Sequence, residues 1–373
     1  MEQTTTLKKY TLILAFLFLT FGGLYFARSF LIPFFTATLI AMLLLPVAQF
    51  LEKKGLNRGF SISLCIILLL LLVSLLIFLL SAQVRLFAED IPAYRLTVNE
   101  KFTDLREFIA KNFHITQEEQ TAYLQNELEN LLVSATVYFR SAILMTSNFL
   151  VSLSIIIFYI FFFLFYRNKF HKFILMITKP ESHSRTMFII QSSTSMTMSY
   201  LGGVLIVVSI LTALNSIGLW IIGIPHPFFL GFIAALLNII PFIGSVVGSI
   251  IPMLVAFLTM DSIWYMVAVG ILFTTIQMIE SYVLTPKITG GKIRLNPLAT
   301  IVALIVGGLL WGIAGMILFI PMLGILKVLF RHIEHLNPFA YLIGAETADD
   351  KDKKQRKQLI NSWKNLFKKG AKA

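Results

Sequence analysis

The side chain best suited to chemistry is that of Glu280, which lies inside a long apolar segment close to Gln277. A carboxylate at membrane depth is costly, and it usually faces a cavity or a basic partner. Glu280 is therefore a candidate binding group for a proton or a cation. The alternative is an ion pair at the membrane interface with Lys287, Lys292 or Arg294. The sequence alone supports both interpretations equally.

A second group of candidates lies in the apolar stretch 228–258, which is broken by proline and glycine. Inside a bilayer such breaks survive only where the chain is buried in protein or lines a cavity. In transporters they mark discontinuous helices at a substrate site. The alternative is a tight helix–helix contact, because Gly244 and Gly248 form a GxxxG motif. Together with Gln277 and Glu280, the residues predicted to form a solute or ion pathway are Asn238, Pro241, Gly244, Ser245, Gly248 and Ser249.

The stretch 298–326 is broken in the same way but contains no charged side chain. Close packing of helices explains its glycines as well as a functional role does. We therefore expect this stretch to act mainly as a packing and gating partner of the first. The residues expected to serve structure rather than binding are Pro252, Pro286, Lys287, Pro297, Gly307, Gly308, Gly312 and Pro321.

Motifs for other chemistries are missing from the sequence. It contains no GxxxxGK[ST], HExxH or GxSxG motif, so neither an ATP motor nor a hydrolase site is indicated. The single cysteine, Cys65, excludes a disulfide within the chain. His332 and His335 flank Glu334, but no further metal ligand is evident. We expect no enzymatic activity, no metal site and no cofactor.

Composition identifies an integral membrane protein. The chain is 57% hydrophobic and 13% charged, with a mean hydropathy of +0.82, and its apolar runs are long enough to cross about 30 Å of hydrocarbon. The net charge of +12 does not indicate nucleic-acid binding, because the basic residues flank the apolar runs and fill the last stretch, 351–372. That placement suits anionic lipid at a cytoplasmic membrane face.

The apolar runs predict an all-α, polytopic helical bundle. Six segments have the length of full crossings: Tyr10–Ala27, Phe30–Phe50, Phe60–Gln83, Ala142–Tyr166, Tyr200–Ile222 and Ile263–Thr285. A polar insert between the third and fourth has apolar residues at spacings of three and four, which predicts a small extracytoplasmic helical hairpin. The expected regions are N-terminal helices (1–83), insert (84–141), fourth helix and cytoplasmic connection (142–199), transport core (200–330) and basic tail (331–373).

Two topologies remain open for the broken stretches. Each can be a re-entrant hairpin, the first dipping from the outer face and the second from the inner face, or each can be a single tilted span. The re-entrant topology places Lys287, Lys292 and Arg294 in the cytoplasm, so the positive-inside rule favours it. Both place the N- and C-termini in the cytoplasm.

Three segments resemble the autoinducer-2 exporter family, a permease-like family of bacterial membrane proteins. They are LIPFFTATLIAMLLLPVAQFLEKKG (31–55), PFFLGFIAALLNIIPFIGSVVGSIIP (227–252) and the segment that begins IESYVLTPKITGGKIRLNP and ends at Phe330. The likeness covers nearly the whole chain. Two glycines, Gly290 and Gly291, follow the Pro-Lys pair where many members have one. Asn296 replaces a common histidine, which weakens any role assigned to that side chain. The positions that match family motifs are Pro241, Gly244, Glu280, Pro286, Lys287, Pro297, Gly307, Gly308 and Pro321.

The resemblance implies membrane transport, either export of the signalling molecule autoinducer-2 or Na⁺(Li⁺)/H⁺ antiport. We expect a secondary transporter of a small polar solute in the bacterial inner membrane, assembled as a homo-oligomer and in contact with lipid. Coupling to H⁺ or Na⁺ through Glu280 is the second hypothesis. A membrane scaffold that transports nothing is the third.

Overall fold

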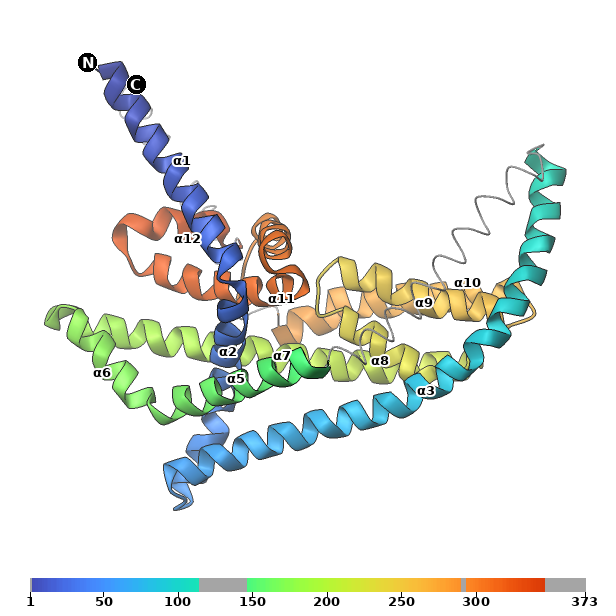
Figure 1. Cartoon of the computed structure of the whole chain (residues 1–373), viewed down its shortest axis with the longest axis horizontal. Coiled ribbons are helices and arrows are strands. Elements are labelled where there is room, and N and C mark those ends of the chain that lie inside the picture. The colour runs from blue at the N-terminus through green and yellow to red at the C-terminus, as the bar shows by residue number, and fades with distance from the viewer. Residues whose placement is uncertain (1, 114–145, 290–292, 346–373) are drawn as a thin grey trace, which may run out of the picture.

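The computed structural model describes residues 2–113, 146–289 and 293–345. In these ranges the chain is almost entirely helical, and its one pair of bridged residues, Leu295 and Gly344, is isolated. The expectation of an all-α protein is confirmed. Viewed down its shortest axis, the molecule is an elongated arrangement of helices of very different lengths (Figure 1).

The N-terminal part consists of α1 (Glu2–Phe26), α2 (Arg28–Lys53) and α3 (Arg58–Phe113). Because α3 has 56 residues, it is about 84 Å long, far more than one crossing needs. It continues through the predicted boundary at residue 84 without a break, so the first arm of the predicted insert is an extension of the third crossing. The second arm of that insert falls in 114–145, outside the described residues.

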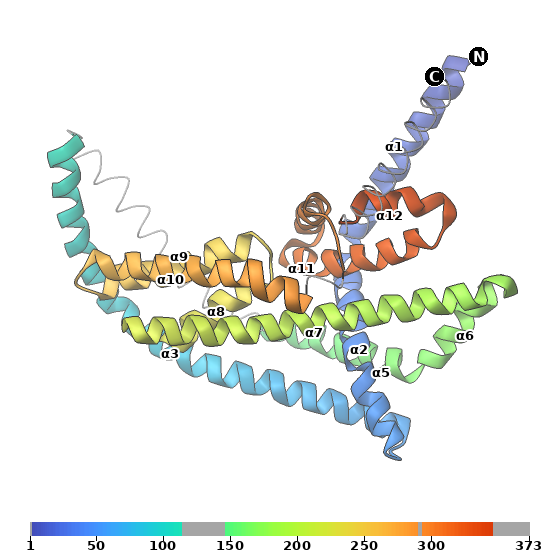
Figure 2. The same ribbon diagram turned by 180° about the vertical axis from the view of Figure 1, so that it is seen from behind.

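The middle of the chain forms α5 (Thr146–Phe165), α6 (Arg167–Ile177), η1 (Pro180–Ser182) and α7 (His183–Ile222). The apolar part of α5 and α6 meet at an angle of 66°. With 40 residues, α7 is about 60 Å long and begins well before the predicted crossing at Tyr200. It contacts α2, α8, α10 and α11, and both ribbon views show it running through the middle of the molecule (Figure 2).

The C-terminal part carries the broken stretches. Its elements are α8 (Pro227–Leu237), α9 (Ile243–Thr259), α10 (Ile263–Ile279), the π-helix η2 (Glu280–Thr289), α11 (Pro297–Arg331), η3 (Glu334–Leu336) and α12 (Asn337–Ile343). Asn296 caps α11 by accepting a hydrogen bond from the Ala299 amide at 2.7 Å, and it donates to the Leu342 carbonyl at 2.6 Å. The beginning of the predicted tail therefore packs back onto the helical body.

The first broken stretch folds as two helices, α8 and α9, which we call the first hairpin. The chain reverses between Asn238 and Phe242, whose φ of 67° is unusual for a side-chain-bearing residue. Gly248 lies against Ala234, and Gly244 lies against the Leu237 carbonyl. The glycines of the GxxxG motif thus hold the two helices at a distance that leaves no room for a side chain.

The second broken stretch, α11, contains a break at Gly312, where φ is 63°. A side chain added at Gly307 would meet the Gly315 carbonyl oxygen at 2.5 Å, so the chain folds back at Gly312 and forms the second hairpin. At its tip the Trp311 indole donates a hydrogen bond of 2.9 Å to the Leu24 carbonyl of α1. This bond joins residues from opposite ends of the sequence.

Length and composition allow five described helices to cross a membrane, or six if α5 and α6 form one bent span. Four predicted crossings coincide with such helices: α2, the apolar part of α3, α7 and α10 with η2. The fourth predicted crossing falls on the bent pair and the first on a shorter apolar helix, Thr11–Phe26. The fifth candidate span is α11, whose 35 residues are interrupted at Gly312.

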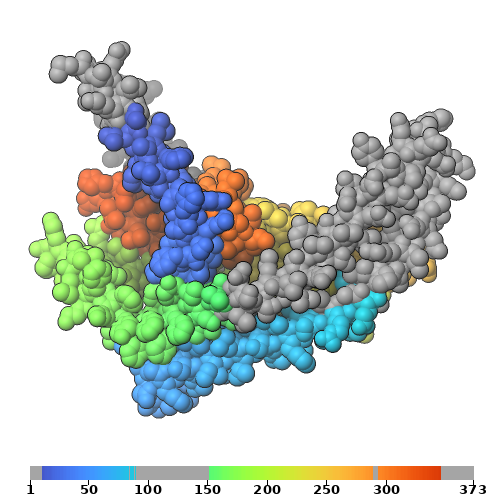
Figure 3. Space-filling view, in the orientation of Figure 1, coloured from blue at the N-terminus to red at the C-terminus, as the bar shows by residue number. Residues whose placement is uncertain are grey.

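Large apolar side chains cover much of the surface, as expected for a protein solvated by lipid. Phe18 on α1 is 79% exposed and Phe78 on α3 is 70% exposed. In the space-filling view, α1 stands away from the other helices and α3 forms a long edge (Figure 3). A buried core lies beneath, between α2, α3 and α5, where Cys65 is 1% exposed.

Candidate functional site

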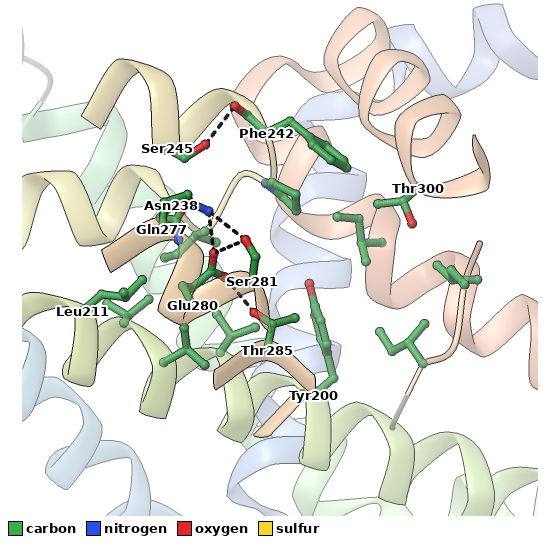
Figure 4. Close-up of a pocket in the computed structure, with 18 of the residues that line it drawn as sticks. Tyr200, Leu211, Asn238, Phe242, Ser245, Gln277, Glu280, Ser281, Thr285 and Thr300 are labelled. Atoms are coloured by element: carbon green, nitrogen blue, oxygen red, sulfur yellow. Dashed lines mark hydrogen bonds between the residues drawn. The ribbon is translucent and has the colours of Figure 1, made fainter. Parts of the chain in front are cut away.

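A cavity of about 430 Å³ lies where the first hairpin, α7, η2 and the start of α11 converge. Its polar lining comes from elements that are far apart in the sequence, as the close-up shows (Figure 4). The residues that line it and carry a polar side chain are Tyr200, Asn238, Ser245, Gln277, Glu280, Ser281, Thr285, Arg294 and Thr300.

Glu280 is held in this cavity by three hydrogen bonds from neutral side chains. Gln277 Nε2 donates to Oε2 at 2.6 Å, Thr285 Oγ1 donates to Oε1 at 2.7 Å, and Ser281 Oγ lies 3.4 Å from Oε2. Neutral donors stabilise a carboxylate without cancelling its charge. These bonds fit the first interpretation of Glu280, a charge that faces a cavity. Of the three basic partners in the alternative, Lys287 is exposed, Arg294 lines the same cavity, and Lys292 lies outside the described residues.

The geometry around Glu280 follows from the π-helix that begins there. A π-helix hydrogen-bonds residues five apart, which brings the Thr285 hydroxyl next to the carboxylate. Pro286 contributes to this local structure because it has no amide hydrogen to continue an α-helical ladder. Short π segments inside α-helices occur frequently at functional sites, and this one positions Glu280, the one carboxylate that the described residues contribute to the cavity lining.

The first hairpin forms the opposite wall. Asn238 and Pro241, at the chain reversal, line the cavity, and so does Ser245 in the first turn of α9. The Ser245 hydroxyl donates to the Phe242 carbonyl at 3.2 Å. Ser249 lies one turn further on, donates to the Val246 carbonyl at 2.9 Å, and lines neither this cavity nor the inner pocket described next.

A small inner pocket of about 20 Å³ continues the cavity between α7 and the first hairpin. Asn238 and Gln277 line both spaces, while Gly244 and Gly248 line only the inner one. Its volume suits a single water molecule. Asn215 of α7 reaches it and is 4% exposed, and its Oδ1 atom has no hydrogen-bond partner among the described residues.

The structure therefore brings together seven of the eight predicted pathway residues, all except Ser249. It adds polar residues that sequence reasoning missed, above all Tyr200, Thr285 and Asn215. Asn215 could have been predicted from the sequence, because it is a polar amide inside a predicted crossing. Tyr200 and Thr285 stood at crossing ends, where polar residues are ordinary. The packing of α7 against η2 brings Tyr200 into the cavity lining, and the π-helix brings Thr285 to Glu280 (Figure 4).

The residues expected to be structural occupy helix starts, turns and close contacts. Pro297 is the first residue of α11, Gly312 forms its turn, and Gly307 lies against Gly315. Gly308 lies against Met316, and both Pro252 and Pro321 are buried inside their helices. No group of three or more His, Cys, Asp or Glu residues in the described ranges is placed to hold a metal ion.

These features define a polytopic helical membrane protein with a polar cavity between two broken helices. The sequence profile described as "AI-2E family transporter" matches residues 14–335. The chain therefore belongs to the AI-2E family of transporters, and the resemblance found in the sequence is confirmed.

Curated relatives agree over most of their length. YrrI of Bacillus subtilis is 25% identical over 316 residues, which are 82% of this chain and 87% of that protein. A protein of Haemophilus influenzae is 24% identical over 354 residues, 92% of this chain and 98% of its own. Both carry only a provisional name as transport proteins. The "AI-2 transport protein TqsA" of Escherichia coli K12 is 25% identical over 323 residues, 86% of this chain and 91% of that one.

Proposed function

We propose that this protein is a secondary transporter that carries a small polar solute through the Glu280 cavity. The observation that supports this most is the cavity itself. Its volume of about 430 Å³ is typical of small-molecule sites. Its described lining combines one carboxylate, Glu280, and one guanidinium, Arg294, with several neutral hydrogen-bonding side chains. Autoinducer-2, which the name of TqsA assigns to that relative, is a solute of this class and is the first one to test.

The two hairpins give this proposal a mechanism. We propose that both are re-entrant, because α8 has only 11 residues and is about 16 Å long, too short to cross about 30 Å of hydrocarbon. The cavity lies between the first hairpin and the start of the second, so movement of one against the other opens it to alternate sides. Under the positive-inside rule the termini face the cytoplasm of a bacterial inner membrane.

Cation coupling is a second candidate, and the hydrogen bonding of Glu280 favours it. The hydrogen bonds that Glu280 accepts come from neutral side chains, which leaves its negative charge available for Na⁺ or a proton. A single carboxylate does not make a complete Na⁺ site, so we rank coupled antiport below transport of a polar organic solute.

Proteoliposomes that contain the full chain test both functions. We expect them to release trapped autoinducer-2 faster than empty vesicles, and Glu280→Gln to slow this release at least tenfold, because loss of one hydrogen bond to a charged group costs about 1.5 kcal/mol or more. Gly202→Ala is the matched control, since nothing lies within 4 Å of a methyl group there.

The test of cation coupling uses the same vesicles with a Na⁺ gradient and a pH-sensitive dye. Proton flux that follows the Na⁺ gradient and disappears in Glu280→Gln would establish antiport instead. A wild-type protein that moves neither the solute nor protons would contradict the transporter proposal and favour a scaffold.

A further inference from the structure

A second cavity of about 490 Å³ lies between the N-terminal part of α7 and the last turns of α11. Its lining includes Arg294, Lys327, Arg331 and His332, with the Ser192 hydroxyl, and no acidic residue among those that the structure describes. We call it the basic pocket. The transport cavity is not lined by Lys327, Arg331 or His332.

Lys327 lines the basic pocket. Its ammonium donates to the Ile293 carbonyl at 3.2 Å and to the Arg294 carbonyl at 2.5 Å. An ammonium has three hydrogens to donate, so one remains after these two bonds. Partial burial together with two nearby guanidinium groups makes this position costly for a cation unless an anion joins it.

Arg331 stands one helical turn beyond Lys327. Residues four apart lie on the same helix face, where like charges repel. Among the described residues, neither Lys327 nor Arg331 forms an ion pair with an acidic side chain. A guanidinium fork and an ammonium facing one cavity are the groups that bind phosphate in proteins.

We propose that the basic pocket binds a phosphate group, supplied either by the headgroup of an anionic lipid or by a phosphorylated solute. The Arg331 guanidinium would donate hydrogen bonds to two phosphate oxygens, and Lys327 and Ser192 would donate to a third. The positive-inside orientation puts this end of α7 and α11 at the cytoplasmic face, where anionic lipid headgroups and phosphorylated metabolites are both present.

The basic pocket adjoins the transport cavity but is distinct from it. Ile293 and Arg294 line both spaces, and Lys327 holds the carbonyls of these two residues. A phosphate on Lys327 would therefore sit behind the wall of the transport cavity. Because Glu280 takes no part in the basic pocket, phosphate binding is expected to survive Glu280→Gln, and the proposal does not depend on the transported solute.

The test is binding to the full-length protein in detergent, with two probes: inorganic phosphate and short-chain phosphatidylglycerol. We expect at least one probe to bind the wild type, and Arg331→Gln to weaken that binding about tenfold through loss of a charge-assisted bond. Arg331→Lys, which keeps the charge, should lose less. Arg85→Gln removes the same charge from the exposed surface of α3 and should change nothing.

Competition separates the two sources of phosphate. If excess inorganic phosphate displaces phosphatidylglycerol, the pocket recognises free phosphate, and if it does not, the lipid headgroup is the ligand. Equal weakening by Arg331→Gln and Arg85→Gln would show attraction by overall charge only and would overturn the proposal. So would the absence of binding by both probes. Unchanged melting temperatures establish that the variants are folded.

Discussion

Replacing Gly244 with alanine tests the contact that shapes the first hairpin. The added methyl carbon would overlap the Leu237 carbonyl and would lie 2.6 Å from the Asn238 Cα atom, whereas real Cβ atoms essentially never come within 3.0 Å of another heavy atom. Both neighbours are backbone, so no side-chain rotation relieves the clash. The two helices must separate at their tightest point, which also displaces Asn238 from the cavity wall.

The magnitude follows from the type of clash. Overpacking costs about 1–3 kcal/mol, and we expect about 3 kcal/mol for Gly244→Ala because only backbone movement accommodates the methyl group. At Gly248 the nearest atom, the Ala234 carbonyl oxygen, would be 3.0 Å away, so a smaller shift costs about 1 kcal/mol. At Gly202 nothing lies within 4 Å, and alanine should stabilise α7 by up to about 1 kcal/mol through its higher helix propensity.

The assay is thermal unfolding of the three variants in one detergent, followed by solute release from proteoliposomes. The expected order of melting temperatures is Gly202→Ala at or above the wild type, then Gly248→Ala, then Gly244→Ala. Solute release should fall most for Gly244→Ala. A Gly244→Ala protein as stable and as active as Gly202→Ala would show that α8 and α9 do not pack as described, and the hairpin reasoning would fail.

Three further perturbations test other parts of the structure. Lys287→Cys should react with an impermeant maleimide from the cytoplasmic side only, and labelling from outside would contradict the re-entrant topology. Asn215→Leu should change stability by no more than about 1 kcal/mol, because removal of the unpartnered Oδ1 offsets loss of the weak 3.5 Å bond from Nδ2 to the Gly231 carbonyl. It should slow solute release, and a large loss of stability in melting experiments would contradict this prediction. Trp311→Phe should cost about 1–2 kcal/mol in the same experiments, because it loses the bond to the Leu24 carbonyl and some buried volume; an unchanged melting temperature would count against that bond.

The sequence located most crossings because burial in hydrocarbon demands long apolar runs, and it located the hairpin glycines because proline and glycine interrupt those runs. It did not predict the lengths of α3 and α7, since polar residues continue a helix in water as readily as apolar ones do in lipid. Nor did it predict the π-helix at Glu280. Neither Tyr200 nor Thr285 could be assigned to the site in advance. Tyr200 comes from α7 through tertiary packing, and Thr285 reaches Glu280 only because the helix between them is a π-helix.

The burial of Cys65 is useful for labelling experiments on this protein. It is the sole sulfhydryl in the chain, and at 1% exposure it lies sealed between three helices, where buried thiols are chemically inert. We therefore expect the natural chain not to react with thiol-directed dyes. A single cysteine introduced in α7 or in either hairpin would then be the one thiol that reacts. Its labelling from each side of the membrane would show which positions are in contact with water during a transport cycle.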